Sequence, residues 1–354
     1  MTQVHIVQKL APGGIEQLAL SLAQSGDMRI FSLEGDAEAL IHAWPRAASV
    51  TGRLEAFGKR PGLDAALPFR LAARLRAVAA TSVVTHHVGP LIYGGMAARL
   101  AGMRSVAHVE HDAWHLSNRK RRAVVGSALR LLRPARIAVS RTVAEAARTR
   151  TGLRFTLVAN GVDCGIYHPR EKAEARKALG LPLDRTIIGA AGRLEHVKGF
   201  DRLVDAASHL PDDMLVVIWG DGSEAGALQQ RIDRLGLRQR VLLAGRSDRL
   251  DQVYPALDVF CLPSRAEGLP LSIIEAQACG IPVVASDVGG GREGLCPATG
   301  RAIAFGDDET HLLAQALAAR LTAPLEADPR AFVLSNLSLD KTRDAYKALE
   351  TCHA

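Results

Sequence analysis

One stretch of the chain, residues 258–284 (DVFCLPSRAEGLPLSIIEAQACGIPVV), combines a buried strand, a polar turn and a helix. Its apolar run, residues 259–262, is too short for a helix and suits a buried strand, which Pro263 ends. Pro270 has the φ angle of a helix start, and Gly280 with the proline two residues later stops the helix. The helix N-terminus therefore faces whatever the turn holds. Its unpaired N–H groups and partial positive charge suit a phosphate or a developing oxyanion.

Charged side chains gather around this helix start. Glu275, near the beginning of the helix, is placed to accept hydrogen bonds from vicinal ribose hydroxyls, although a carboxylate there also simply complements the helix dipole. In the loop 192–199, Arg193 can bind two phosphate oxygens at once and Lys198 supplies a point charge. Either cation alone is typical of a protein surface. Together with the helix start they favour a diphosphate site.

The length and composition predict a two-domain soluble protein. At 354 residues the chain exceeds what one hydrophobic core usually supports. Its 48% apolar and 23% charged residues are ordinary for globular proteins. No apolar run reaches the roughly 18 residues of a membrane span, the N-terminus lacks the pattern of a signal peptide, and the cysteines have no C-x-x-C spacing. We therefore expect a cytoplasmic protein.

Much of the formal charge of +7 lies in one basic segment, residues 118–136 (NRKRRAVVGSALRLLRPAR). A basic amphipathic helix of this kind can lie on the anionic inner face of the cell membrane. It can equally be a solvated surface helix whose apolar stripe packs inward, and the sequence favours neither. Aromatic residues make up only 4% and do not alternate with the basic ones, so no nucleic-acid partner is expected.

Short apolar segments alternate with helix-length patterns along the whole chain, which predicts two α/β domains with doubly wound parallel sheets. The polar tract 170–185 separates the two series. The expected strands of the first series are residues 3–8, 28–32, 82–86, 105–110, 137–140 and 155–159. Those of the second are residues 186–191, 215–219, 241–244, 259–262 and 283–286.

Histidines crowd the ends of two of these strands. His111 and His115 have the spacing of the two histidines in H-E-x-x-H, but Asp follows His111 and no third ligand is evident, so no metal site is expected. A histidine at a strand end suits a hydrogen-bond donor or a general acid/base, and a purely structural role is the alternative. The other members of the group are His86, His87, His108, Glu110 and Asp112.

A family resemblance adds to this interpretation. The succession NGVD, GRLEHVKGFDRLVDA, GDG, PSRAEGLPLSIIEA and GIPVVASDVGG resembles the retaining nucleotide-sugar glycosyltransferases of the GT-B class, family GT4 (glycosyl transferases group 1). That family includes bacterial lipopolysaccharide and exopolysaccharide enzymes. The match is dense over residues 159–293 and weak before residue 100, where GGIE is the main matching motif. Its specific part is Glu267 followed eight residues later by Glu275, embedded in EGLPLSIIEA.

The resemblance implies two facing Rossmann-like domains with parallel sheets, and a C-terminal helix that crosses back to the first domain. Residues 1–165, with the helix 337–354, would form the N-terminal acceptor domain, and residues 166–336 the nucleotide-sugar donor domain. The donor would be a nucleotide diphosphate-sugar, with UDP favoured and GDP as the alternative, and no further cofactor. The acceptor would be a glycan or a lipid-linked molecule in cell-surface polysaccharide or lipopolysaccharide biosynthesis.

The resemblance also implies residue roles. Arg193 and Lys198 would hold the diphosphate, Glu275 the ribose, and Glu267 a hydroxyl of the transferred sugar. Further donor contacts would come from backbone and loop positions, namely Gly14, Gly268, Leu269, Pro270 and Arg246. His111 matches the family's histidine near the reacting sugar.

The expected reaction is a metal-independent, retaining sugar transfer. The chain has no Asp-x-Asp, so the cations and the helix start would stabilise the leaving diphosphate. Glu267 could serve as a covalent nucleophile, but the resemblance points to same-face attack, in which a phosphate oxygen helps to take the proton. A nucleotide-sugar epimerase of the same fold is the alternative enzyme, and a catalytically silent binding subunit is a third hypothesis.

Overall fold

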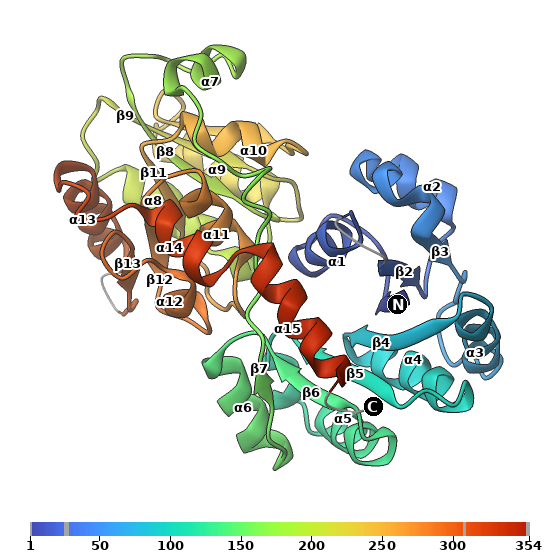
Figure 1. Cartoon of the computed structure of the whole chain (residues 1–354). Coiled ribbons are helices and arrows are strands. Elements are labelled where there is room, and N and C mark those ends of the chain that lie inside the picture. The colour runs from blue at the N-terminus through green and yellow to red at the C-terminus, as the bar shows by residue number, and fades with distance from the viewer. Residues whose placement is uncertain (1, 25–27, 307–308, 352–354) are drawn as a thin grey trace. The chain divides into compact units, whose positions relative to one another are not determined.

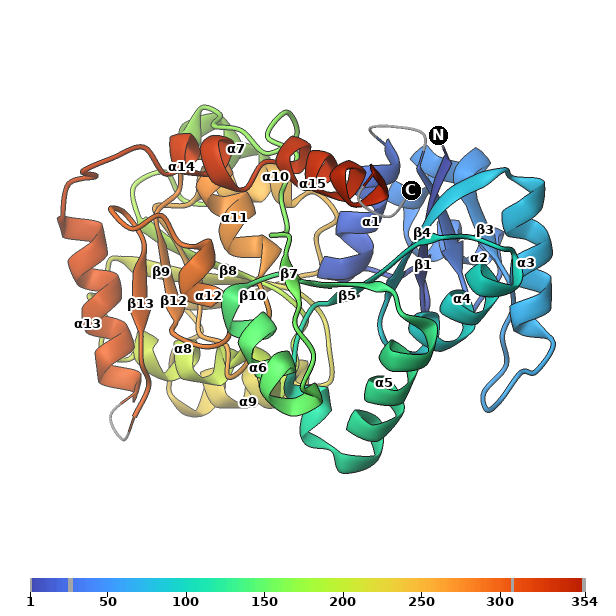
Figure 2. The same ribbon diagram turned by 60° about the horizontal axis from the view of Figure 1, so that its bottom comes forward.

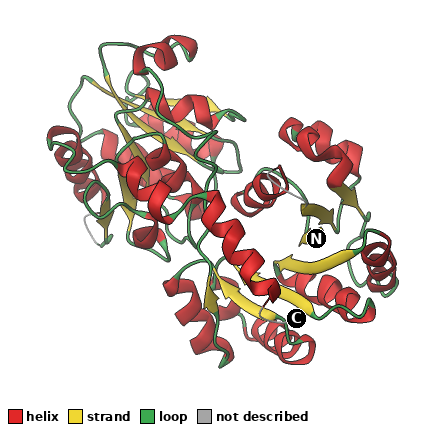
Figure 3. Cartoon of the chain, in the orientation of Figure 1, coloured by secondary structure: helices red, strands yellow, loops and turns green. Residues whose placement is uncertain are grey.

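The computed structural model describes residues 2–24, 28–306 and 309–351, which form two compact units (Figure 1). The first unit comprises the residues up to Gly161 together with those from Leu339 onward, and the second comprises Val162–Ser338. The corresponding boundaries were expected at residues 165/166 and 336/337, four residues and two residues away from those of the structure. Both units are strand and helix alternations, as Figure 3 shows by colour.

The first unit contains a seven-stranded parallel sheet of order β3-β2-β1-β4-β5-β6-β7. The expected parallel sheet is confirmed. Its strands are β1 (Thr2–Val7), β2 (Met28–Ser32), β3 (Leu54–Ala56), β4 (Ala80–His86), β5 (Ser105–Glu110), β6 (Ala135–Ala138) and β7 (Thr156–Leu157).

Three details of this sheet differ from the expectation, and one is that β7 covers only Thr156–Leu157 of the expected residues 155–159. The strand expected at residues 137–140 ends at Ala138, because the Ser140 side chain caps the next helix by accepting a hydrogen bond from the Val143 N–H at 3.1 Å. The three-residue strand β3 was not predicted, since it is too short to show a period-2 pattern.

Helices cover this sheet, and their apolar stripes form its core. Val4, Ile6 and Phe31 from the strands pack with Leu71 and Ala97 from two helices. The helices are α1 (Gly14–Gln24), α2 (Ala37–Ala43), α3 (Leu67–Ala77), α4 (Val88–Leu100), α5 (Arg119–Leu132), α6 (Arg141–Thr151) and α15 (Leu339–Thr351), with short 3₁₀ turns η1 (Pro45–Arg53) and η2 (Trp114–Ser117).

Helix α15 belongs to the first unit although it ends the chain. It contacts α1 and β5, and its Tyr346 is buried with its ring nearly perpendicular to that of His5, the centroids 5.6 Å apart. The helix was expected from residue 337, but Leu337 is the C-terminal cap of the preceding helix, and α15 begins two residues later.

The second unit contains a six-stranded parallel sheet of order β10-β9-β8-β11-β12-β13. Its strands are β8 (Thr186–Ala191), β9 (Met214–Trp219), β10 (Val241–Gly245), β11 (Val259–Leu262), β12 (Val283–Ser286) and β13 (Arg301–Ile303). Five of these strands lie where the sequence predicted them, with ends that differ by one residue at most. The short edge strand β13 was not predicted.

The helices of the second unit are α7 (Lys172–Ala178), α8 (Phe200–Ala207), α9 (Ala225–Arg234), α10 (Leu250–Val253), α11 (Leu271–Ala278), α12 (Gly291–Gly294), α13 (Glu309–Thr322) and α14 (Pro329–Asn336), with 3₁₀ turns η3 (His196–Lys198) and η4 (Tyr254–Ala256). Helices α8 and α9 lie on one side of the sheet and α11 on the other (Figure 2).

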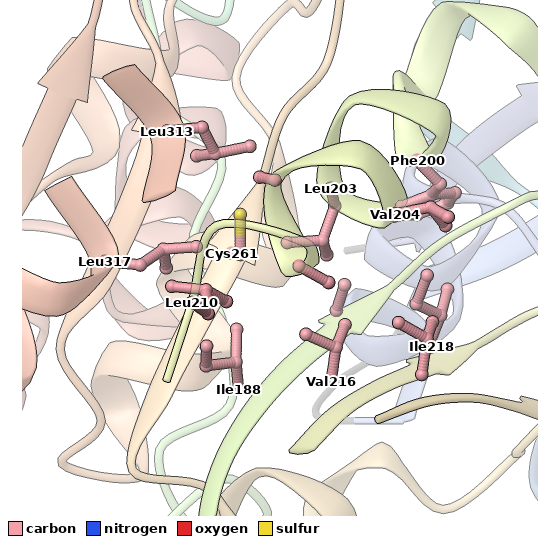
Figure 4. Close-up of a cluster of buried hydrophobic side chains, with 14 of the residues drawn as sticks. Ile188, Phe200, Leu203, Val204, Leu210, Val216, Ile218, Cys261, Leu313 and Leu317 are labelled. Carbon is pink, nitrogen blue, oxygen red and sulfur yellow. The ribbon is translucent and has the colours of Figure 1, made fainter. Parts of the chain in front are cut away.

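Apolar residues of α8 recur with helical spacing and pack on the sheet. Leu203 and Val204 meet Ile188, Val216 and Cys261 in a buried cluster (Figure 4). This core fixes the strands whose carboxyl ends carry the loops of interest. No helix in the described ranges is both long and apolar enough to cross a bilayer.

Candidate functional site

The sheet order of the second unit brings four loops to one edge. Strands β9, β8, β11 and β12 are neighbours and parallel, so the loops that follow them start at the same carboxyl edge. The loops comprise residues 220–224, 192–199, 263–270 and 287–290. They contain the GDG motif, both predicted phosphate-binding cations, Glu267, and the glycines Gly289 and Gly290.

Hydrogen bonds join these loops into one frame. The Arg265 N–H donates to the Val197 carbonyl at 2.8 Å, and the Gly290 N–H donates to the Gly268 carbonyl at 2.6 Å. The Arg265 guanidinium also pairs with Asp201 at the start of α8, at 2.6 Å. The positions of the loops are therefore set by backbone contacts as well as by side chains.

Lys198 and Glu267 meet in this frame. The Lys198 Nζ lies 2.6 Å from Glu267 Oε1, and the Ser264 Oγ–H donates to the same oxygen at 2.6 Å. Only 9% of the Glu267 side chain and 20% of the Lys198 side chain are exposed. The sequence analysis assigned these residues to different parts of a ligand and did not predict that they pair. It also missed Ser264, although this residue lies inside the matched motif.

Two glycines permit the close approach of the loops. Gly199 has a φ of +66°, and a Cβ there would lie 2.1 Å from the Pro263 carbonyl oxygen. Gly289 has a φ of +55°, and a Cβ there would lie 1.7 Å from the Glu267 carbonyl oxygen. Since an L side chain would meet backbone and adopt a strained φ, only glycine fits either position.

The N-terminus of α11 opens next to Glu267. Pro270 was expected as the first helical residue, but its φ of −72° and ψ of 123° are extended, so it precedes the helix and Leu271 begins it. Proline fits because its fixed φ is compatible with both conformations. As the N-cap residue, Pro270 makes no side-chain capping hydrogen bond to α11. Gly268, Leu269 and Pro270 are buried.

Glu275 lies inside α11 and is only 5% exposed. The Tyr254 hydroxyl donates a hydrogen bond to Glu275 Oε2 at 2.7 Å. Burial, followed by the Glu275 charge, raises the pKa of Tyr254 well above its usual value, so the phenol stays a donor. Tyr254 was missed by the sequence analysis, because its distance of 21 residues from Glu275 leaves no local signal.

The two predicted arginines are on the surface of the second unit. Arg193 is exposed, and its guanidinium forms no ion pair with another described residue. Arg246 follows β10 and pairs with Asp248, with Nη2 and Oδ1 2.8 Å apart. The structure therefore gives Arg246 a local carboxylate partner that the sequence analysis did not foresee.

Gly14 and His111 belong to the first unit. Gly14 is the exposed first residue of α1. His111 directly follows β5, is 9% exposed, and has its Nε2 2.8 Å from His86 Nδ1.

The neighbouring histidines pair with one another and with polar or acidic groups. Although burial opposes it, the contacts with Asp112 and Glu110 raise the pKa of His115. His108 contacts Thr85 and Glu110. Across the described ranges, no three or more His, Cys, Asp or Glu side chains are grouped so that they could hold a metal ion.

Comparison with known families gives matches over both units. A model described as Glycosyltransferase Family 4 matches residues 12–165. A model described as Glycosyl transferases group 1 matches residues 171–328.

Several curated proteins are similar over part of the chain. A D-inositol 3-phosphate glycosyltransferase of Mycobacteroides abscessus is 42% identical over 143 residues, 39% of this chain and 32% of that protein. The putative glycosyltransferase EpsF of Bacillus subtilis is 33% identical over 205 residues, 54% and 53% of the two chains. The lipopolysaccharide core biosynthesis mannosyltransferase LpsB of Rhizobium meliloti is 38% identical over 146 residues, 38% and 41% of the two chains. The chain thus spans about a third to a half of the length of these curated relatives.

Solved structures resemble the whole chain. Anabaena HepE in complex with UDP has a TM-score of 0.85 at 21% identity, covering 99% of this chain and 100% of that one. WaaG, a glycosyltransferase involved in lipopolysaccharide biosynthesis, has a TM-score of 0.71 at 17% identity, covering 98% and 99%. These likenesses confirm the predicted fold class. Because two successive glycosyltransferase models cover most of the chain, it belongs to the group 1 glycosyltransferases of the GT-B fold.

Proposed function

We propose that the protein transfers a sugar from a nucleotide diphosphate-sugar to a hydroxyl group of a glycan or lipid-linked acceptor. The observation that carries this proposal is the frame in the second unit, where Lys198, Glu267 and Ser264 lie beside the uncapped start of α11. A cation, a carboxylate and a helix start without a side-chain cap from its N-cap residue together suit a phosphate joined to a hydroxylated sugar. The family membership supports the same activity.

In this proposal the diphosphate is held by the α11 N–H groups, Lys198 and Arg193. The ammonium of Lys198 has three N–H donors, so it can keep Glu267 and also contact a phosphate oxygen. Arg193 is exposed, so its guanidinium group can turn toward a second phosphate. The backbone of Gly268, Leu269 and Pro270 would lie against the sugar and phosphate.

Glu275 would bind the ribose and Glu267 a hydroxyl of the transferred sugar. The Tyr254 hydroxyl keeps the Glu275 carboxylate in one orientation, which a bidentate contact with vicinal hydroxyls needs. Arg246 would contact the base once it leaves Asp248. As the family resemblance implies, the turn at Gly14 would approach the phosphate, and His111 would contact the reacting sugar.

We further propose that the transfer retains the anomeric configuration and needs no metal ion. Lys198, Arg193 and the α11 dipole would stabilise the charge of the leaving diphosphate. The acceptor hydroxyl would attack from the same face, with a phosphate oxygen taking its proton. UDP is the favoured nucleotide, supported by complexes of HepE with UDP and UDP-glucose, and GDP is the alternative.

The acceptor pathway we favour is lipopolysaccharide or exopolysaccharide assembly, supported by the names of LpsB and WaaG.

Helix α5 is the segment that would bring the protein to a membrane surface. Val125 and Leu129 are buried, as a packed surface helix requires, but Val124 is 47% and Leu131 is 82% exposed. With the basic residues of its first turn, this exposed part would bind the anionic inner membrane surface. Flotation with anionic and neutral vesicles tests the binding, and equal recovery with both would leave α5 a surface helix.

A panel of nucleotide sugars tests the proposed function. The protein is incubated with each donor, and thermal shift, nucleotide release and donor interconversion are measured. Sugar transfer with nucleotide release, unaffected by EDTA, and a product of unchanged anomeric configuration support the proposal. Interconversion of the donor without transfer would instead establish the epimerase. Failure of every donor to bind would favour a binding subunit.

A further inference from the structure

Three buried histidines form a continuous line in the first unit. They come from neighbouring strands, with His5 on β1, His86 at the end of β4 and His111 directly after β5. His5 Nδ1 lies 2.9 Å from His86 Nε2, and His86 Nδ1 lies 2.8 Å from His111 Nε2. Their exposed fractions are 1%, 0% and 9%. The family-based roles involve only the last of the three.

The line has a direction, because a neutral imidazole carries one N–H donor and one acceptor nitrogen. Each contact in the line needs one N–H donor and one acceptor nitrogen, so the tautomer of one ring determines the tautomer of the next. The end at Gln3 decides which way the donors point. Gln3 Oε1 lies 2.9 Å from His5 Nε2, while the Gln3 amide N–H donates to Ser82 Oγ at 3.2 Å.

A carbonyl oxygen can only accept, so His5 carries its proton on Nε2. His5 Nδ1 is then an acceptor, and His86 donates to it from Nε2. By the same step, His86 Nδ1 accepts from His111 Nε2. The last nitrogen of the line, His111 Nδ1, is left with a lone pair. It is buried and has no hydrogen-bond partner among the described residues.

The surroundings keep the line neutral. Burial lowers the pKa of His5 to about 4. Burial, followed by repulsion from the neighbouring histidines, holds the pKa values of His86 and His111 well below the usual value. His87 lies outside the line, with its ring centroid 6.3 Å from that of His111 and its Nε2 3.5 Å from Glu16.

We propose that Gln3, His5 and His86 are positioning residues that hold His111 as its Nε2–H tautomer, so that His111 Nδ1 accepts a hydrogen bond from a hydroxyl group of the substrate. The tautomer rests on the contacts in the first unit alone, whereas the substrate hydroxyl rests on the proposed function. If the Gln3 amide were reversed, every donor in the line would reverse, and His111 would present an N–H instead.

The tautomer is tested without any substrate. In protein labelled with ¹⁵N at histidine, long-range proton–nitrogen NMR spectra at pH 7.5 distinguish the two neutral tautomers and the cation. Signals are assigned from single His→Gln variants. The expected result is that His5, His86 and His111 are all protonated on Nε2 only. A His111 protonated on Nδ1, or on both nitrogens, would overturn the proposal while leaving the glycosyltransferase function untouched.

Variants then test whether the line acts on the reaction. Gln3→Leu removes the anchor and should produce a mixture of His111 tautomers, with kcat/KM reduced about 10-fold or more and nucleotide affinity unchanged. Ser82→Ala removes the hydroxyl that accepts from the Gln3 amide N–H, which weakens the preference for one amide orientation, and should give a smaller change in the same direction. Thr85→Val is the matched control, because Thr85 lies next to His86 on β4 but its buried hydroxyl bonds to His108 on β5, which is not a member of the line.

The outcomes separate the two proposals. Tautomers that mix in Gln3→Leu while kcat/KM stays at the wild-type value would show that the line has no catalytic role. Tautomers that remain fixed in Gln3→Leu would show that Gln3 is not the anchor. If Gln3→Leu fails to fold, the wild-type spectrum and Ser82→Ala still decide the question.

Discussion

The ammonium of Lys198 lies 2.6 Å from the Glu267 carboxylate, although the two residues come from loops that follow different strands. Strands β8 and β11 are neighbours in the sheet, so their loops start side by side. Since both side chains are mostly buried, each neutralises the other's charge at a site that would otherwise be costly to desolvate. The pair therefore couples the proposed phosphate contact to the proposed sugar contact.

Lys198→Met should weaken binding of UDP, or of GDP if that is the nucleotide used, by about 10-fold to 100-fold, since a charge-assisted contact contributes about 1.5–3 kcal/mol. Isothermal titration calorimetry measures this. Lys172→Met is the control, because it also breaks a lysine–carboxylate pair of the second unit, with Asp258 at 2.7 Å, but lies on α7 away from the loop frame. Unchanged affinity in Lys198→Met would remove the diphosphate assignment.

Glu267→Gln should lower turnover more than nucleotide affinity. Glutamine keeps an oxygen that can accept from Ser264 and Lys198, so the loops stay joined, but the negative charge is lost. We expect kcat to fall about 100-fold or more, while the Kd for the nucleotide changes by less than about 3-fold. Steady-state kinetics and calorimetry give the two values. A covalent sugar trapped on Glu267 in the wild-type protein would replace same-face attack with a double-displacement mechanism.

Tyr254→Phe should weaken donor binding through Glu275. The variant removes the hydroxyl that donates to a buried carboxylate, which costs about 1–3 kcal/mol and weakens the hold on its orientation. We expect the affinity for the nucleoside diphosphate to fall, and the effect to be smaller in a Glu275→Gln background. A double-mutant cycle on binding measures this coupling. Additive effects would mean that Tyr254 only supports the core.

Gly289→Ala should destabilise the protein and reduce its activity together. The positive φ alone costs about 1–3 kcal/mol for a residue with a side chain. The new Cβ would also push the Glu267 backbone away. Gly226→Ala is the matched control. This glycine lies in α9, and apart from its chain neighbours and its own helix backbone no atom of the described residues lies within 4 Å of its would-be Cβ. The variant should therefore be about 0.5–1 kcal/mol more stable. Urea unfolding measures both. A stable, active Gly289→Ala would show that the two loops need not lie so close.

The sequence predicted most of the fold because its strands are apolar runs bounded by clear turn signals. Strands β8, β11 and β12 match the expected residues. The edge strands β3 and β13 were missed, since three residues are too few for a periodic pattern and their pairing is set by a neighbouring strand. Local capping also overrides composition, as Ser140 shows at the end of β6.

For the candidate site, the sequence named groups but not their partners. Glu267, Glu275 and Lys198 were found from motifs and residue chemistry. Their partners come from sheet order and helix packing, so neither the Lys198 pair nor Tyr254 follows from spacing along the chain. Glycine positions were visible in the sequence, but which carbonyl each one accommodates depends on loop geometry.

The buried histidine line predicts a pH dependence of stability. The folded-state pKa of His5 is about 4, below the value of 6.5 expected in the unfolded chain, so the unfolded state binds more protons between these values. The stability that depends on neutral His5 is thus fully present above pH 6.5 and is lost as the pH falls toward 4. Between pH 7.5 and 5.5 this loss should amount to about 1.4 kcal/mol for His5 alone.

His5→Phe isolates this contribution, because other groups titrate in both proteins. Phenylalanine removes the hydrogen bonds that Gln3 and His86 make with His5, so the variant should be less stable at pH 7.5. Its free energy of unfolding should nevertheless fall less steeply than that of the wild type between pH 7.5 and 5.5. Urea titrations at several pH values measure the two slopes. Parallel slopes would mean that His5 already titrates normally in the folded protein, which is incompatible with a neutral donor line that ends at His111.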